Sequence, residues 1–174
     1  MENSAAQQLL SQAYDEHADA IFRHCYFKVH DRELAKDLMQ QVFLKCWQYL
    51  ECGKQIEQMR AFLYQTANNT VIDHVRKHKK HVAKSLEEMQ EAQGFDPAST
   101  ESTTAEAEAH YTEAAVHNVL ANIKEPYRTA VMLRYIDELS PAEIAETLKI
   151  SVSNASARIS RGLHMLRSLV SPNG

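Results

Sequence analysis

Residues that interrupt helices are scarce in this chain, which contains four Gly and four Pro among 174 residues. A many-stranded sandwich or barrel needs frequent turns, and Gly and Pro supply most of them. Hydrophobic residues make up 44% of the chain, which is typical of a globular protein. We therefore expect an all-α protein, long enough for one or two small domains.

Several protein classes do not fit the sequence. No run approaches the roughly 18 apolar residues that a membrane span needs, and the first residues lack the basic and apolar parts of a secretory signal. The three cysteines, Cys25, Cys46 and Cys52, form no CxxC pair, which disfavours a disulfide framework or a zinc ribbon. We expect a cytoplasmic protein with reduced thiols, no resident metal and no other cofactor.

Charge is unevenly distributed, although the formal net charge is only −4. Residues 85–112 contain seven Asp and Glu but no Lys or Arg, together with a cluster of Ser and Thr. This composition is typical of a solvated linker. A basic cluster directly precedes it, made up of Arg76, Lys77, Lys79, Lys80 and Lys84. We therefore expect two small helical domains, residues 1–84 and 113–174, joined by an acidic flexible linker over 85–112.

The first half shows three stretches with helical spacing. Over residues 34–50 the apolar positions recur with a period close to 3.6, at Leu34, Leu38, Val42, Cys46 and Leu50. His30 or Asp31 would begin this helix. Similar stripes over 9–25 and 62–75 predict two further helices, and three helices can share one core.

The second half contains two helix starts in close succession. Ser140 is a suitable N-cap, Pro141 suits the first helical position, and Glu143 completes a capping box. Ser151 then caps a second helix with apolar residues at steps of three or four. A short helix, a turn and a longer helix predict a helix-turn-helix, but a plain helical hairpin would show similar stripes.

If the second helix of this motif enters a major groove, its exposed N-terminal side chains must meet bases and phosphates. Asn pairs well with adenine, Arg pairs well with guanine, and Ser suits phosphate. The candidate DNA contacts are Ser153, Asn154, Ser156, Ala157, Arg158 and Arg161. Positive charge is sparse here, so this domain alone should bind DNA weakly. The alternative is a solvated helix face without a ligand.

The helix over 62–75 leads into the basic cluster and offers a second candidate DNA site. Its aromatic and amide side chains could contact an unpaired base while the basic residues hold phosphates. The candidates are Tyr64, Asn68, Asn69, Arg76, Lys77 and Lys80. For the aromatic side chains, a place in the core explains the pattern at least as well. His74 and His78 have a ligand spacing, but they lack the HExxH pattern and lysines crowd them, so we expect no metal there.

The order of these segments resembles the extracytoplasmic-function (ECF) class of bacterial sigma factors over about residues 9–170. LAKDLMQQVFLKCW (34–47) is similar to the family segment that docks on the polymerase clamp helices. FLYQTANNTVIDHVRK (62–77) is similar to the segment that recognises and melts the minus-ten element. EPYRTAVMLRY (125–135) and the helix-turn-helix look like the domain that reads the minus-thirty-five element and touches the polymerase flap.

The resemblance implies a non-enzymatic protein with sigma regions two and four, which binds core RNA polymerase and promoter DNA. It also implies an anti-sigma partner and no direct insertion into the membrane. The implied polymerase contacts are Asp37, Gln40, Gln41 and Phe43, and the loop 51–58 lies where the family forms its pocket for an extruded base. Lys149 stands where Gly is usual; if it needs a positive φ, the cost is roughly 1 kcal/mol.

Two other functions fit parts of the pattern. A stand-alone helix-turn-helix regulator would bind duplex DNA without polymerase, and a helical interaction module would sequester a protein partner. Asp37 and Gln40 favour the sigma-factor hypothesis, because a plain regulator has no need for these side chains on an apolar-striped helix. The acidic linker is either a solvated spacer or a mimic of a phosphate backbone inside polymerase.

Overall fold

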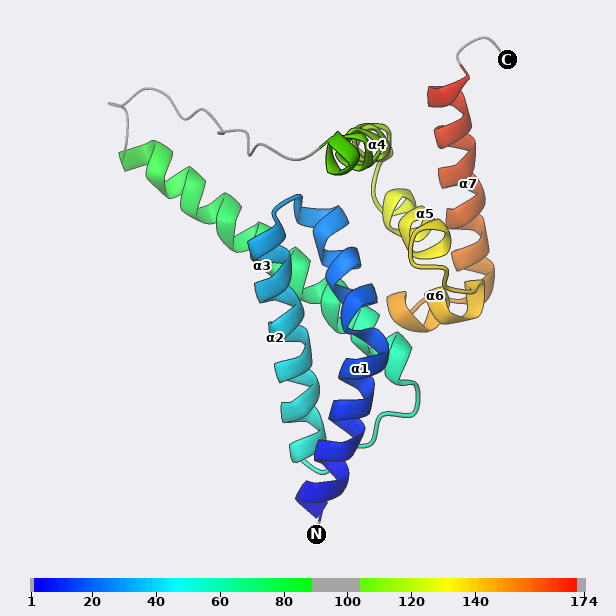
Figure 1. Ribbon diagram of the computed structural model, residues 1–174. Coiled ribbons are helices and arrows are strands. Elements are labelled where there is room, and N and C mark those ends of the chain that lie inside the picture. The colour runs from blue at the N-terminus through cyan, green and yellow to red at the C-terminus, as the bar shows by residue number, and fades with distance from the viewer. Residues whose placement is uncertain (1, 89–103, 172–174) are drawn as a thin grey trace.

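The computed structural model describes residues 2–88 and 104–171. Within these ranges the chain forms seven helices and no strand, which confirms the all-α expectation (Figure 1). The helices are α1 (Glu2–Val29), α2 (Arg32–Glu51), α3 (Met59–Glu88), α4 (Thr104–Ala121), α5 (Tyr127–Tyr135), α6 (Pro141–Leu148) and α7 (Val152–Val170).

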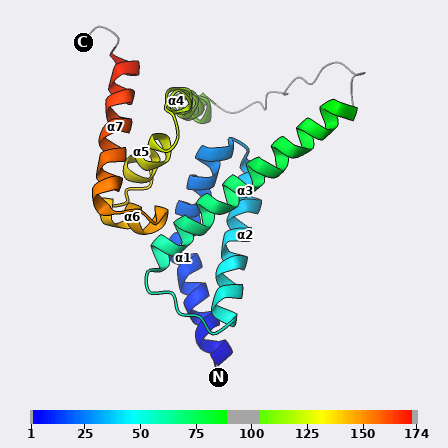
Figure 2. The same ribbon diagram turned by 180° about the vertical axis from the view of Figure 1, so that it is seen from behind.

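Helices α1, α2 and α3 form the first packing unit. The α1 and α2 helices lie side by side, and α3 crosses them obliquely, as the view from behind shows (Figure 2). Asp31 is the N-cap of α2, and its side chain accepts a hydrogen bond from the Leu34 N–H at 2.9 Å. In the stripe predicted for this helix, Leu38, Val42, Cys46 and Leu50 are buried and Leu34 is half-buried. A cap and a 3.6-residue stripe therefore account for both the start and the orientation of α2.

Helices α4 to α7 form the second unit, which contains the predicted helix-turn-helix. Ser140 and Glu143 form the expected capping box at the start of α6, and Ser151 caps α7 by accepting from the Asn154 N–H. The turn between α6 and α7 starts at Lys149, which has φ 54° and ψ 48° in the left-handed region. The position where glycine is usual in the family therefore does need a positive φ in this chain.

Two helices extend into the range expected to be a linker. Helix α3 continues to Glu88 and α4 begins at Thr104, so the boundaries expected at 84 and 112 fall within helices. Residues 104–109 alternate Ala and Glu after the initial Thr, and both residue types have high helix propensity. The rest of the expected linker, residues 89–103, lies outside the described residues.

The two units pack against each other and share buried apolar residues. One hydrophobic cluster includes Leu63 and Ala67 of α3 together with Leu133, Leu139 and Ile144 of the second unit. The N-terminal part of α3 lies next to α6 in both views (Figures 1 and 2). Direct packing of this kind was not part of the sequence analysis, which treated the halves as separate domains.

The strained turn residue gives a stability prediction. Replacing Lys149 by Gly should raise the free energy of unfolding by about 1 kcal/mol, because an L-residue pays roughly 1–2 kcal/mol for a left-handed backbone, partly offset by the greater chain entropy of unfolded Gly. Urea denaturation followed by circular dichroism measures the change. Lys149→Ala is the matched control, since it removes the same charge and keeps the Cβ. Equal stabilisation by both variants would show that charge, not backbone strain, is responsible.

Candidate functional site

The residues predicted to bind polymerase lie on α2. Asp37, Gln40 and Gln41 are exposed, and Leu44 beside them is 55% exposed. We call these four residues the α2 face. Leu44 was missed by the sequence analysis, although its place outside the buried stripe was a usable signal. A single exposed apolar side chain is normal on a protein surface, so Leu44 gains meaning only together with the polar residues beside it.

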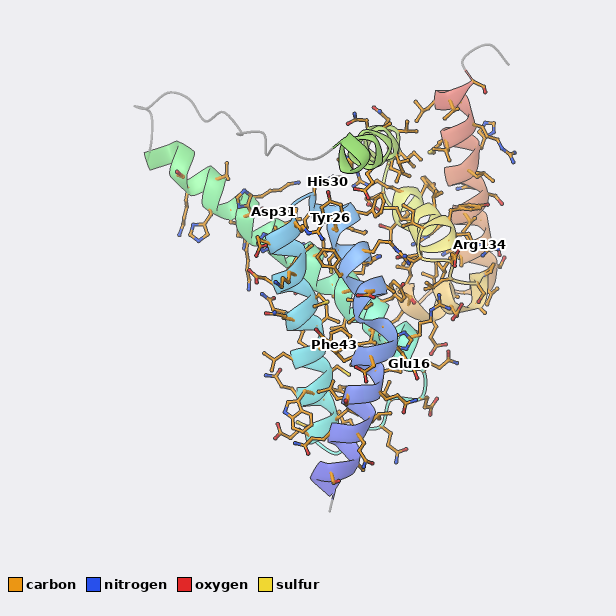
Figure 3. The ribbon with its side chains drawn as sticks, viewed as in Figure 1. Glu16, Tyr26, His30, Asp31, Phe43 and Arg134 are labelled. Atoms are coloured by element: carbon orange, nitrogen blue, oxygen red, sulfur yellow. The ribbon has the colours of Figure 1, made fainter. Side chains whose placement is uncertain are left out.

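Phe43 differs from the other three predicted polymerase contacts. Its side chain is only 6% exposed and lies between α1 and α2, where it meets the Tyr14 ring edge-on with centroids 4.9 Å apart (Figure 3). Phe43 also lines a shallow apolar hollow of about 400 Å³ with Leu44 and Trp47. In this arrangement Phe43 packs α2 against α1 and does not present its ring to a partner.

The structure divides the predicted minus-ten residues into two groups. Asn69, Arg76, Lys77 and Lys80 are exposed along α3, as a DNA contact requires. Tyr64 is 1% exposed, because it packs edge-on against His24 at 5.3 Å, and this burial raises the pKa of its hydroxyl. Tyr64 therefore cannot touch DNA in this arrangement. Its place in the core is the alternative that the sequence left open.

Asn68 is the second predicted minus-ten residue whose side chain already has a partner within the protein. Its Oδ1 accepts a hydrogen bond from Lys28 Nζ at 3.1 Å, and the same ammonium group donates to Thr129 Oγ1 at 2.9 Å. Burial lowers the pKa of Lys28, although the nearby Glu125 carboxylate opposes that effect. Lys28 thus connects α3 with the second unit through two polar side chains.

The loop between α2 and α3 borders a hollow that also involves the N-terminal part of α1. The hollow has a volume of about 700 Å³ and is lined by Leu50, Glu51 and residues 53–56, together with Ala5, Ala6 and Leu9 of α1. At its edge, Lys54 Nζ lies 5.0 Å from the centre of the Tyr49 ring. The hollow is in the loop for which the resemblance implies a base pocket.

The predicted minus-thirty-five residues share the N-terminal half of α7. Ser153, Asn154, Ser156, Ala157 and Arg161 are exposed, whereas Ala155 and Ile159 between them are buried. Arg158 is half-buried, and its Nε donates to Asn154 Oδ1 at 3.2 Å. The structure therefore brings these six residues together on one helix half, with the buried residues holding that half against the unit.

A buried polar pair between the units was not found by the sequence analysis. His24 Nδ1 of α1 and Asp137 Oδ2 of the α5–α6 connection are 2.8 Å apart, and both residues are at most 2% exposed. Arg60 of α3 adds an ion pair to Glu143 Oε1 at 3.0 Å. No local pattern could have revealed these partners, because they lie 113 and 83 residues apart in the sequence.

The described residues contain no group of three or more His, Cys, Asp or Glu side chains that could hold a metal ion. In the same part of the chain, none of the helices is long and apolar enough to cross a membrane.

The comparisons with known proteins agree on one family. A model for Sigma-70 region 2 matches residues 13–81, and a model for Sigma-70 region 4 matches residues 113–166. The ECF RNA polymerase sigma factor SigW of Bacillus subtilis is 28% identical, covering 92% of this chain and 88% of SigW. SigL of Mycobacterium tuberculosis, also an ECF sigma factor, is 29% identical, covering 94% of this chain and 90% of SigL. The chain belongs to the ECF sigma factors.

Two solved structures show that the fold of this sigma factor is shared. The structure of CnrH in complex with the cytosolic domain of CnrY matches with a TM-score of 0.73 and 20% identity, over 99% of this chain and 94% of the other. The sigma factor RpoE of Bartonella quintana, in complex with the anti-sigma factor NepR, matches with a TM-score of 0.68 and 18% identity, over 94% and 98% of the two chains.

The family settles the class of function. The sigma factor directs RNA polymerase to promoters, and the stand-alone regulator is not favoured. The first unit corresponds to region 2 and the second to region 4.

A contact between two histidines gives a pH prediction. The rings of His30 and His117 are 3.4 Å apart between centroids, near the start of α2 (Figure 3 labels His30). Partial burial lowers the pKa of both, and the His117 charge lowers that of His30 further. The unfolded chain therefore takes up protons first as pH falls below about 6.5, so the free energy of unfolding should decrease there.

Urea denaturation at roughly pH 7.5 and roughly pH 5.5 measures this decrease, since the two values lie on either side of the ordinary histidine pKa. His117→Gln removes one titrating ring and should make stability less dependent on pH. His164→Gln is the control, because His164 is exposed on α7. Full pH dependence in His117→Gln would contradict the role of this ring pair.

Proposed function

We propose that the α2 face of this sigma factor binds the clamp helices of core RNA polymerase. The supporting observation is that Asp37, Gln40 and Leu44 are all exposed on one helix whose opposite side is buried. Charged and amide groups beside an apolar side chain suit a protein partner, which supplies donors and acceptors as well as apolar area. Gln41 stands where an acidic residue is usual in the family, so this face carries one charge fewer.

The α7 helix reads the minus-thirty-five element as duplex DNA. A major groove about 12 Å wide admits one α-helix, and the exposed side chains of Ser153, Asn154, Ser156, Ala157 and Arg161 lie on the first half of this one. Ser151 caps the N-terminus through its side chain, and the positive end of the helix dipole then faces an incoming phosphate. Asn154, Ala155 and Ser156 differ from the usual family residues, so the typical promoter preference does not transfer.

The minus-ten element is assigned to α3 and the loop before it. Arg76, Lys77 and Lys80 form an exposed basic end that suits a displaced DNA strand, and Asn69 lies exposed nearer to the loop. Extruding a base costs a few kcal/mol, which contacts in the hollow beside residues 53–56 would offset. The basic end and the hollow together support melting as the role of region 2.

The sigma factor works in the cytoplasm, where it meets polymerase, and it catalyses no reaction itself, because bond formation belongs to polymerase. Domain boundaries lie near residues 84 and 113, close to the ends of the matched family regions, with α3 and α4 continuing beyond them to Glu88 and from Thr104. Its activity is restrained by an anti-sigma factor, a kind of partner that the structure of the RpoE complex names for that protein.

Binding to core RNA polymerase tests the α2 face. Asp37→Ala combined with Gln40→Ala should weaken binding about tenfold or more, since each removes a polar contact at a desolvated surface. Fluorescence anisotropy of labelled sigma factor with core enzyme gives the dissociation constant. Asp19→Ala is the matched control, because Asp19 is an exposed carboxylate on α1. Normal binding by the double variant would reject the assignment, and no binding by the unaltered protein would reject the function.

Promoter binding by the complete holoenzyme tests the role of α7. Arg161→Ala should weaken binding to promoters with an intact minus-thirty-five element by roughly 1–3 kcal/mol if it reads guanine. If Arg161 instead contacts phosphate, binding to all DNA sequences should weaken by the same factor. The slope of the logarithm of the binding constant against the logarithm of salt concentration should then fall by about one. Arg167→Ala, also exposed on α7 but near its C-terminal end, is the control. Equal promoter binding by both variants would show that residues outside the N-terminal half of α7 read the minus-thirty-five element.

A further inference from the structure

A cleft of about 430 Å³ is lined by residues of α1, α3, α5, α6 and α7. Five of its lining side chains are cationic: Lys28, Arg76, Lys79, Arg128 and Arg158. Glu125 is the single carboxylate among the described lining residues, which leaves an excess of four positive charges. We propose that this cleft, which we call the basic cleft, binds a nucleoside diphosphate or triphosphate.

Two arginines of the basic cleft keep their terminal amino groups available for a ligand. Arg128 donates through Nε to Glu125 Oε1 at 2.9 Å, and Arg158 donates through Nε to Asn154 Oδ1 at 3.2 Å. Each of these bonds uses only the Nε–H, so both amino groups of each guanidinium can donate elsewhere. The planar fork of a guanidinium matches two oxygens of one phosphate. The two arginines therefore suit a ligand with more than one phosphate.

Lys28 adds a further donor on the α1 side of the basic cleft. Its ammonium group donates to Asn68 Oδ1 and Thr129 Oγ1, which leaves one of its three N–H groups for a ligand. The Glu125 carboxylate does not repel a ligand with its full charge, because Oε1 accepts from Arg128 and Oε2 accepts from the Thr129 hydroxyl at 2.7 Å. The donors of the cleft are thus only partly used by the protein itself.

An apolar floor accompanies the cations. Val71, Ile72 and Val75 of α3 and Leu148 of α6 line the same cleft. Ile72 and Val75 are 39% and 38% exposed, although both are apolar. A flat base that covers them gains free energy in proportion to the apolar area removed from water. An inorganic anion leaves this floor uncovered, so cations beside an apolar floor favour a nucleotide.

The size and charge of the basic cleft narrow the choice of ligand. Its volume of about 430 Å³ lies in the range of small-molecule sites, roughly 300–1,000 Å³. A peptide or a DNA strand needs a longer groove than this. A single phosphate carries a charge of about −2 at neutral pH, and each further phosphate adds to it. Two or three phosphates therefore match the excess positive charge better than one.

A bound nucleotide has a consequence for promoter binding, and this part of the inference rests on the proposed function. The basic cleft includes Asn68 and Arg76, which we assign to the minus-ten element, and Arg158, which we assign to the minus-thirty-five element. A nucleotide in the cleft occupies these groups, so it competes with promoter DNA and inhibits initiation. Binding of the nucleotide itself does not depend on the proposed function.

Isothermal titration calorimetry of the free, full-length sigma factor with GDP, ADP and pyrophosphate tests the basic cleft. We expect one GDP or ADP per chain with a micromolar dissociation constant. Pyrophosphate should bind about tenfold more weakly, because it does not cover the apolar floor. Val75→Ser should weaken GDP binding roughly threefold and leave pyrophosphate binding unchanged, because it removes apolar area and no charge.

A cationic variant separates the basic cleft from general charge effects. Lys79→Ala should weaken binding of GDP and of pyrophosphate about tenfold, because it removes a charge-assisted contact to phosphate. Lys84→Ala is the matched control, since Lys84 is also exposed on α3 but does not line the cleft. Circular dichroism checks that both variants keep their helicity.

Four outcomes would overturn the inference. They are no binding of GDP at millimolar concentration, pyrophosphate binding as tight as that of GDP, unchanged GDP binding by Val75→Ser, and equal losses in Lys79→Ala and Lys84→Ala. Binding of a short single-stranded DNA that Lys79→Ala weakens, without any binding of GDP, would assign the cleft to promoter DNA and overturn the inference as well. The titration contains neither polymerase nor promoter, so its result stands apart from any failure of the proposed function.

Discussion

The contact between α3 and α6 is the feature on which the rest of the structure depends. Helix α3 supplies Leu63 and Ala67 to the shared core, and α6 supplies Ile144 and Ala145. Burial of such side chains contributes about 25 cal/mol per Å² of apolar surface, and it acts in no particular direction. Apolar packing alone would therefore tolerate several relative positions of the two regions. The buried His24–Asp137 pair selects one, because a hydrogen bond requires a defined geometry.

Features governed by neighbouring residues were predicted well from the sequence. The helix starts at Asp31, Ser140 and Ser151 follow from side chains that accept a hydrogen bond from an N–H three positions later. The stripe on α2 gave the buried side, and hence the exposed positions of the α2 face. The positive φ of Lys149 follows from the tight turn into α7. In each case the cause lies within a few residues of its effect.

Features governed by distant residues were not predictable in the same way. The aromatic residues of α3 fit both stacking on a base and packing in a core, and only the approach of His24 from α1 places Tyr64 in the core. Phe43 belonged to a matched motif but faces inward beside Tyr14. The start of α4 was hidden because Ala and Glu serve both a helix and a solvated linker. A family motif thus identifies a segment, but the fold decides which of its side chains are accessible.

The low positive charge of this sigma factor is consistent with its dependence on polymerase. Region 4 from residue 113 carries seven Lys and Arg against six Asp and Glu, so counterion release alone supplies little affinity for DNA. A protein that reads DNA only as part of a larger enzyme gains from such weakness, since the free protein is not retained by unspecific DNA.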